Sequence, residues 1–250
     1  PDRMPVLPRY ELLENLGPEE YLQGDDSGLG TGGNGTAPCN WFQHWENVMD
    51  PFHVVILHDS FSGTQFVQPM GIMPRCDFES FEHGVRSYQY RDLGDGKRLR
   101  RITETVMPNL RVVASPVLDP GPCSGIGWTV PVDSTHYRLL NVHRKKKSDA
   151  PNKRRGSLLG GKKWIDMTEE EHRDFPGDWE AQTGQGPITF HSEEHLAASD
   201  KGIRMLRKFV EEQLKIVADG GDPVGVTRVQ GSETIPSLAG NWFEDAEKVA

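Results

Sequence analysis

The sequence predicts an α+β fold, with an antiparallel sheet of successive strands in the middle of the chain and a long helix near the C-terminus. Two observations support this prediction. Between residues 85 and 143, apolar runs alternate with turn signals such as Gly94-Asp95-Gly96, a pattern typical of β-hairpins. From Leu196 to Val217, apolar residues recur at helical spacing, which indicates an amphipathic helix.

Composition limits the function classes. The chain has 250 residues and a net charge of −9, which argues against general nucleic-acid binding. No apolar run approaches the roughly 18–20 residues that a membrane helix needs. The three cysteines form no C-x-x-C or C-x-x-H pattern, so we expect neither a disulfide framework nor a cysteine-ligated cluster. These features favour a soluble, cytoplasmic protein with no membrane or nucleic-acid partner.

The N-terminal region has little periodic structure before residue 40. Residues 24–36 are rich in Gly, Asp, Ser and Asn and predict a mobile loop. Gly28-x-Gly30-x-x-Gly33 matches the dinucleotide-binding pattern, but no strand precedes it and no helix follows, so we interpret it as loop. Asn40 is a good N-cap, and Trp41 and Trp45 begin a helical spacing after it. We therefore expect the first helix to start there.

The remaining elements follow in order. The predicted strands span residues 85–93, 98–107, 109–115, 127–132 and 135–143. Residues 144–163 are strongly basic, and we interpret them as a solvated insertion rather than a binding patch. Thr168-x-x-Glu171 is a capping box that predicts a short helix. Gly220-Gly221-Asp222-Pro223 should end the C-terminal helix.

Two histidines bracket a purely apolar tetrapeptide. His53 and His58 would lie about 140° apart on a regular helix, so a kink at Pro51 or a helix end is needed to turn both toward one point. Asp50 lies one turn before His53 and could bond its second ring nitrogen. Taken alone, the pattern is weak and more typical of two unrelated core histidines.

A carboxylate lies beside the apolar stripe of the C-terminal helix. Asp200 follows Leu196 by four residues and precedes Ile203 by three. A buried carboxylate is costly unless it is paired or binds a metal, although the first turn of a helix also favours an acidic residue. Two imidazoles and one carboxylate would form the facial triad that binds non-haem Fe(II) and leaves positions open for O₂ and substrate.

Four separated blocks resemble the α subunits of Rieske-type aromatic-ring oxygenases, in particular the phthalate-dioxygenase-like branch. The blocks are Asn40-Trp41 with Glu46-Asn47-x-x-Asp50-x-x-His53-x₄-His58, then Leu57 to Phe66, Trp128 to His136, and Glu194-His195-Leu196-x-x-Ser199-Asp200-x-Gly202-Ile203.

The resemblance implies a role for each matching residue. His53, His58 and Asp200 would be the iron ligands, Asn47 would neighbour the iron, and Asp50 would bridge this iron to the Rieske centre of an adjacent subunit. The implied fold is a helix-grip, in which a curved antiparallel sheet wraps around a long C-terminal helix. The implied partners are an aromatic substrate, O₂ and a reductase or ferredoxin, in a homotrimer or hexamer.

The sequence departs from the family pattern in two places. It has no C-x-H…C-x-x-H pair, so we expect residues 1–250 to form the mononuclear iron catalytic domain alone, with the [2Fe–2S] cluster in an N-terminal domain that this chain lacks. Phe190-His191 stands where relatives often carry Asp-Arg, which makes Glu193 or Glu194 a fallback ligand.

The sequence thus predicts an oxygenase that hydroxylates or O-demethylates an aromatic compound such as an aryl carboxylate. A carboxylate substrate would require an Arg or Lys in the pocket, and the sequence leaves its identity open. The alternative function is a non-catalytic helix-grip module that encloses an apolar small molecule.

Overall fold

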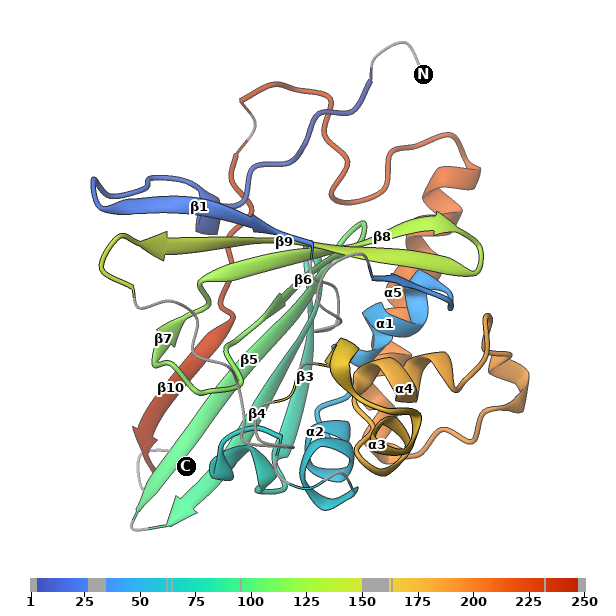
Figure 1. Ribbon diagram of the computed structural model, residues 1–250. Coiled ribbons are helices and arrows are strands. Elements are labelled where there is room, and N and C mark those ends of the chain that lie inside the picture. The colour runs from blue at the N-terminus through green and yellow to red at the C-terminus, as the bar shows by residue number, and fades with distance from the viewer. Residues whose placement is uncertain are drawn as a thin grey trace.

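The computed structural model describes residues 4–26, 35–61, 63, 65–94, 96–149, 162, 164–231 and 233–246. The Gly28-x-Gly30-x-x-Gly33 segment lies outside these residues, as does most of the basic 144–163 segment. The described residues build an antiparallel sheet whose main path runs β1-β9-β8-β6-β5-β10-β7, with β4 on β5, β3 on β4, and β2 on β9 (Figure 1). The strands are β1 (Glu20–Asp25), β2 (Thr36–Ala37), β3 (Arg75–Phe81), β4 (Gly84–Gly94), β5 (Lys97–Val106), β6 (Leu110–Val113), β7 (Gly121–Pro122), β8 (Gly125–Asp133), β9 (His136–Lys146) and β10 (Gly240–Asp245).

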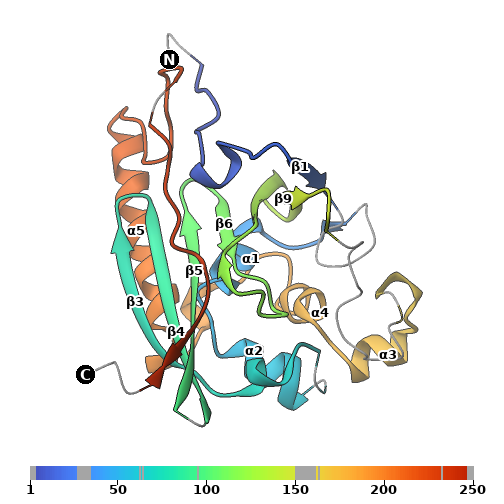
Figure 2. The same cartoon turned by 90° about the vertical axis from the view of Figure 1, so that its left-hand side faces the viewer.

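The helices gather on one side of this sheet (Figures 1 and 2). They are α1 (Trp41–Asn47), α2 (His53–Val55), α3 (Glu169–Asp174), α4 (Asp178–Thr183) and α5 (Lys201–Ala218). The short helical turns are η1 (Glu11–Leu13), which lies on the other face of the sheet, η2 (Ile56–Phe61), η3 (Gln68–Gly71), η5 (Trp164–Asp166), η6 (His191–Glu193) and η7 (Ala198–Asp200). Helix α5 packs on β3 and β4, and α1 packs on β8 and β9. No helix in the described ranges is long and apolar enough to cross a membrane.

The predicted α+β class, with its antiparallel sheet and C-terminal helix, is confirmed. The side chain of Asn40 caps α1 by accepting a hydrogen bond from the Phe42 amide at 2.9 Å. Thr168 and Glu171 form the predicted capping box of α3. The C-terminal helix begins at Lys201, so Leu196 is not part of its apolar stripe, and its side chain is exposed.

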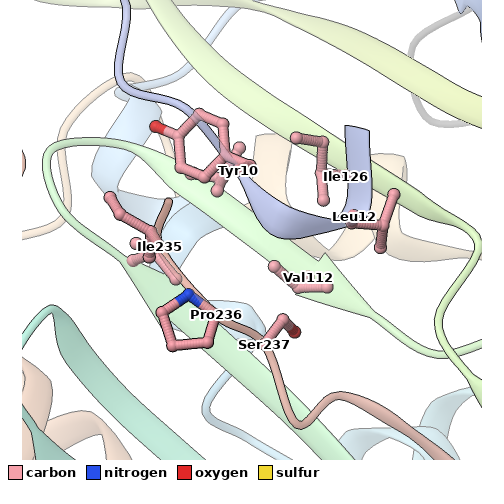
Figure 3. A pocket seen from close by; sticks show the side chains of 9 residues that line it. Tyr10, Leu12, Val112, Ile126, Ile235, Pro236 and Ser237 are labelled. Atoms are coloured by element: carbon pink, nitrogen blue, oxygen red, sulfur yellow. The ribbon is translucent and has the colours of Figure 1, made fainter. Parts of the chain in front are cut away.

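The opposite face of the sheet is covered by the N-terminal segment and the segment before β10. Tyr10 and Ile235 form a bridge there and pack with Val112 and Ile126. Figure 3 shows the side chains around the small apolar pocket between them, which has a volume of only about 10 Å³. This pocket has room for roughly one water molecule, so it is not a substrate site.

On the helix side, a core cluster joins α1, α5 and β4. Trp45, Met49, Val85 and Leu206 are buried together in it. The indole Nε1 of Trp45 also donates a hydrogen bond to the Leu110 carbonyl at 2.9 Å, which satisfies the one polar atom of this ring. These contacts fix the end of α1, from which the chain enters the histidine segment.

Gly202 allows α5 to approach that segment closely. A Cβ at this position would lie 2.3 Å from Cε1 of Phe78 and 2.6 Å from the Met49 carbonyl oxygen. We expect Gly202→Ala to destabilise the protein by about 1–2 kcal/mol, because overpacking outweighs the gain of about 1 kcal/mol in helix propensity. Urea denaturation measures this change. The exposed Lys208→Ala is the control, and a Gly202→Ala protein as stable as wild type would contradict the close packing.

Candidate metal centre

The two histidines come from α2 and η2, which follow each other without a break. His53 begins α2, and His58 lies in η2, a π-helical turn. Hydrogen bonds in a π-helix join residues five apart, so this wider turn allows side chains five positions apart to face the same way. The two imidazole rings are accordingly 5.4 Å apart between centroids. A regular α-helix would have separated them.

Asp178, the first residue of α4, completes the group. Its Oδ1 lies 3.6 Å from Nε2 of His53 and 3.3 Å from Nε2 of His58. Each of the three residues offers a ligand atom within 4.8 Å of the others. Asn47 donates a hydrogen bond from Nδ2 to the same Oδ1 at 3.1 Å, and so orients the carboxylate from the end of α1. We call His53, His58 and Asp178 the triad.

Hydrogen bonds on the far side of each ring direct both Nε2 atoms toward Asp178. The Nδ1 of His53 donates to the Asp50 carbonyl oxygen. The Nδ1 of His58 donates to Oε1 of Gln65 at 2.7 Å, and Gln65 is held by its own donation to the Pro176 carbonyl at 3.0 Å. With Nδ1 protonated in this way, each Nε2 can carry the lone pair that a metal ligand requires.

The electrostatics of the triad favour a cation. Burial alone would raise the pKa of the Asp178 carboxyl, but the hydrogen bond from His58 and the electrostatic interactions with His58 and His53 lower it well below its ordinary value. Burial alone would lower the pKa of His58, but its hydrogen bond to Asp178 raises it. The carboxylate is therefore ionised, and either a proton or a metal ion between it and the imidazoles would neutralise it.

A buried network holds α4 in place. Gln182, one turn after Asp178, accepts hydrogen bonds at Oε1 from the Tyr137 hydroxyl at 2.7 Å and from Nδ1 of His44 at 3.1 Å. The His44 ring also stacks on Tyr137. Burial lowers the pKa of His44 to about 3, so this imidazole is neutral. The network joins α4 to α1 and β9 and thereby positions Asp178.

The prediction for Asp200 needs correction, because the structure does not bring this residue to the histidines. Its Oδ2 accepts a hydrogen bond from the Ala197 amide at 2.6 Å within η7, and the residue occupies the position just before α5. This is the helix-terminus role that the sequence left open as the alternative. The fallback ligands are elsewhere too, since Glu194 pairs with Arg207 and neither Glu193 nor Glu194 belongs to the triad.

The two other candidate residues lie at the triad. Asn47 bonds to Asp178, as described above. The Asp50 carboxylate does not bond the His53 ring: it accepts from the Phe52 amide at 2.9 Å and the His53 amide at 3.3 Å, and its Oδ2 is 3.8 Å from His53 Nδ1. The backbone carbonyl of Asp50 bonds the ring instead.

Sequence reasoning missed Asp178. The local signal is Pro176-Gly177-Asp178. Pro and Gly interrupt regular structure, and the helix that follows has a carboxylate at its first position. Asp200 has the same kind of position at the start of α5. Nothing in the local pattern distinguishes the two.

Comparisons with known proteins identify relatives. The chain is 42% identical over 254 aligned positions to the phenoxybenzoate dioxygenase subunit alpha of Ectopseudomonas oleovorans, which covers 99% of this chain and 61% of the relative. It is 29% identical to the oxygenase subunit of tert-butanol monooxygenase / tert-amyl alcohol desaturase from Aquincola tertiaricarbonis, covering 78% of this chain and 46% of the relative. It is 27% identical to the oxygenase subunit of 5,5'-dehydrodivanillate O-demethylase from Sphingobium sp. (strain NBRC 103272 / SYK-6), and this match covers 76% of this chain and 45% of the relative.

Among solved structures, the chain is similar to dicamba monooxygenase bound to 3,6-dichlorosalicylic acid, at 11% identity and a TM-score of 0.44. The match covers 81% of this chain and 61% of the dicamba monooxygenase chain. No family model matches the chain. The relatives are oxygenase subunits of the Rieske type, and the chain is similar to them over three quarters or more of its own length. The resemblance inferred from the sequence is thus confirmed. The chain spans about half to three fifths of the length of these relatives.

Proposed function

We propose that this chain carries the oxygen-activating, mononuclear iron centre of an oxygenase that hydroxylates or O-demethylates an aromatic compound, with His53, His58 and Asp178 as the iron ligands. The observation that carries the proposal is the convergence of two Nε2 atoms and one carboxylate oxygen on one point. Two imidazoles and a carboxylate are the ligand set of non-haem Fe(II) oxygenases. The chemistry that Fe(II) supplies in such a site is the reductive activation of O₂ beside a bound substrate.

The chain's own residues prepare the triad for this task. Gln65 and the Asp50 carbonyl hold the imidazole protons on Nδ1, which keeps both Nε2 atoms available as ligands. Asn47 holds one oxygen of Asp178 from the side of α1. A ligand set fixed in advance by such hydrogen bonds loses little conformational freedom when it binds a metal.

The names of the relatives support an aromatic substrate. One is a phenoxybenzoate dioxygenase subunit and another belongs to a 5,5'-dehydrodivanillate O-demethylase. We extend the proposal to an aryl carboxylate as substrate, and to a reductase or ferredoxin as electron donor acting through a [2Fe–2S] Rieske cluster held outside residues 1–250. In a cytoplasmic homotrimer or hexamer, Asp50 would lie between this iron and the cluster of the adjacent subunit.

The alternative, a carrier of apolar ligands without a metal, is less well supported. A carrier gains nothing from placing two imidazoles and a carboxylate together, and burying ionisable groups is costly. A separation of more than about 6 Å between His53, His58 and Asp200 would favour a carrier, since imidazole and carboxylate ligands lie roughly 2.0–2.2 Å from such a metal. Asp200 is indeed apart from the histidines, but Asp178 stands in its place. The ligand atoms of the triad lie within 4.8 Å of one another.

Anaerobic titration with Fe(II) tests the proposal. We expect the purified protein to bind about one iron per chain, and nitric oxide to give the electron paramagnetic resonance signal of a mononuclear centre with an open position. Absence of stoichiometric iron would contradict the proposal. Oxygen consumption by the full-length protein with its reductase, measured with phenoxybenzoates and methoxybenzoates, then tests the substrate class.

Gln65→Leu should weaken iron binding without removing a ligand. The substitution leaves Nδ1 of His58 without its acceptor, so the ring loses its fixed tautomer and orientation, and we expect about 10–100-fold lower affinity for Fe(II). Competition with a calibrated chelator measures the affinity. Gln65→Glu is the matched variant, because its carboxylate still accepts the Nδ1 proton. Equal affinity in wild type and Gln65→Leu would show that Gln65 does not orient the ligand.

A further inference from the structure

An arginine is fully buried on the side of the sheet that faces the helices. Arg91 lies in β4, and its side chain is 0% exposed. It pairs in register with Leu99 of β5, and residues directly opposite each other share a face of the sheet. Leu99 packs in an apolar cluster with Met70, Val54 and Phe66. Arg91 therefore points toward the layer that contains α2 and η3.

The guanidinium of Arg91 contacts neutral acceptors only. Its Nε donates to the Ile72 carbonyl at 3.0 Å and its Nη1 to Oε1 of Gln89 at 3.2 Å. Its Nη2 is buried and has no hydrogen-bond partner in the described part of the chain. The thiol of Cys76 interacts with it electrostatically, but burial raises the pKa of that thiol to about 12, so it carries no compensating charge at neutral pH.

This arrangement is costly for the protein alone. Burial lowers the pKa of Arg91 to about 10, so the group stays charged at neutral pH. No carboxylate lies within ion-pair distance of it among the described residues, and a buried charge without a counter-ion costs several kcal/mol. A free donor and an uncompensated positive charge together fit an anion.

A second buried arginine on the same face shows the contrast. Arg101 is 4% exposed and lies opposite Gln89 in the register. Its Nη1 donates to the Ser115 carbonyl at 2.9 Å and to Oδ1 of Asn241 at 3.0 Å, and its Nη2 donates to the Ala114 carbonyl at 2.5 Å. Both terminal nitrogens of Arg101 are thus bonded to protein, whereas one terminal nitrogen of Arg91 is not.

The apolar cluster beside Arg91 reaches the triad. Val54 follows His53 directly, and the ring of Phe66 lies 4.7 Å from the ring of His58. Both residues pack against the cluster that contains Leu99, the partner of Arg91 in the register. Apolar side chains thus lie between the metal ligands and a buried cation, the two features that an aromatic ring with an acidic substituent requires.

We propose that Arg91 binds the carboxylate of an aromatic carboxylate ligand whose ring packs on the apolar cluster around Val54, Phe66 and Leu99. This inference rests on the proposed function and assigns the residue that selects its substrate class. A charge-assisted hydrogen bond from Nη2 to one carboxylate oxygen would place the ring against this apolar cluster. Arg91 is then a specificity-determining residue.

Calorimetric binding of benzoate and of its neutral isostere benzamide tests the assignment. We expect wild type to prefer benzoate, and Arg91→Met to lose about 10-fold or more of its benzoate affinity with little change for benzamide, since a hydrogen bond to a charged group is worth at least a factor of ten. Arg91→Lys keeps the charge and should retain part of the preference. Inorganic phosphate is the third probe, and binding of phosphate as tight as that of benzoate would overturn the aromatic assignment.

The matched control is Arg101→Met. We expect it to lower the melting temperature and leave the benzoate-to-benzamide ratio unchanged, whereas Arg91→Met should keep or raise the melting temperature because it removes an unpaired buried charge. An unchanged ratio in Arg91→Met would overturn the inference. Iron content separates the two proposals. Wild type that binds no iron contradicts the proposed function. An iron-loaded Arg91→Met protein whose benzoate-to-benzamide affinity ratio is unchanged contradicts only the role of Arg91.

Discussion

Asp178→Ala should abolish stoichiometric Fe(II) binding, and Asp200→Ala should leave it intact. The carboxylate of Asp178 lies 3.3 Å and 3.6 Å from the two imidazole Nε2 atoms, whereas that of Asp200 accepts a hydrogen bond from the Ala197 amide. We expect the affinity of Asp178→Ala for Fe(II) to fall by more than the 10–100-fold that loss of an outer partner costs, because a ligand itself is removed. Anaerobic equilibrium dialysis measures both variants.

The control for this pair is stability. Asp200→Ala removes the hydrogen bond from the Ala197 amide and should cost about 1 kcal/mol of folding free energy, so its iron content is compared well below its unfolding transition. His53→Ala and His58→Ala should behave like Asp178→Ala. Iron retained by Asp178→Ala but lost from Asp200→Ala would contradict the triad and restore the ligand set predicted from the sequence.

Arg207→Met should strongly destabilise the protein. Arg207 of α5 donates to both carboxylate oxygens of Glu46 at 2.5 Å and 2.9 Å, and to both of Glu194 at 2.5 Å and 3.0 Å. The side chains of Arg207, Glu46 and Glu194 are only 14%, 11% and 19% exposed. Removing the cation leaves two carboxylates facing each other with little solvent, which should cost about 3 kcal/mol.

The same network gives a pH dependence. The hydrogen bonds from Arg207 lower the pKa of Glu194 from its ordinary value of 4.5. A carboxyl with a lowered folded-state pKa stabilises the protein above its ordinary pKa, and this stabilisation is lost as the pH falls through the lowered value. Wild type should therefore lose stability below about pH 4.5. In Arg207→Met this part of the pH dependence should disappear.

Urea denaturation at several pH values measures both effects. Arg204→Ala is the control, since Arg204 is an exposed residue of the same helix and should change stability by less than about 0.5 kcal/mol. A similar small change in Arg207→Met would show that the network contributes little. A pH profile unchanged by Arg207→Met would mean that another carboxyl governs acid stability.

The fold was largely predictable because its main signals are local. The β4–β5 hairpin is marked by Gly94 and Gly96, both of which have positive φ angles. Strands β3 and β10 were missed because they lie outside the run of turn signals between residues 85 and 143, and each is defined by its pairing with another strand.

The site was predictable only in part. The histidines stand out in the sequence, but their convergence depends on the π-helical turn of η2. No residue type in the sequence predicts such a turn. Asp178 meets Asn47 across 131 positions of chain, and such a contact leaves no local signature. Asp200 precedes a long helix whose apolar periodicity is clear in the sequence. That periodicity led to the prediction of Asp200, rather than Asp178, as the carboxylate beside the histidines.

The distance in sequence between α2 and α4 also gives the metal a second role. A single ion held by His58 and Asp178 would close a very long loop, and closing a long loop removes much of the freedom of the unfolded chain. The free energy of binding the ion then adds to the free energy of unfolding, by about 2.7 kcal/mol at a free ion concentration one hundred times the Kd. An iron ion bound there would link the first and last thirds of the chain, so loss of iron should increase its susceptibility to proteolysis.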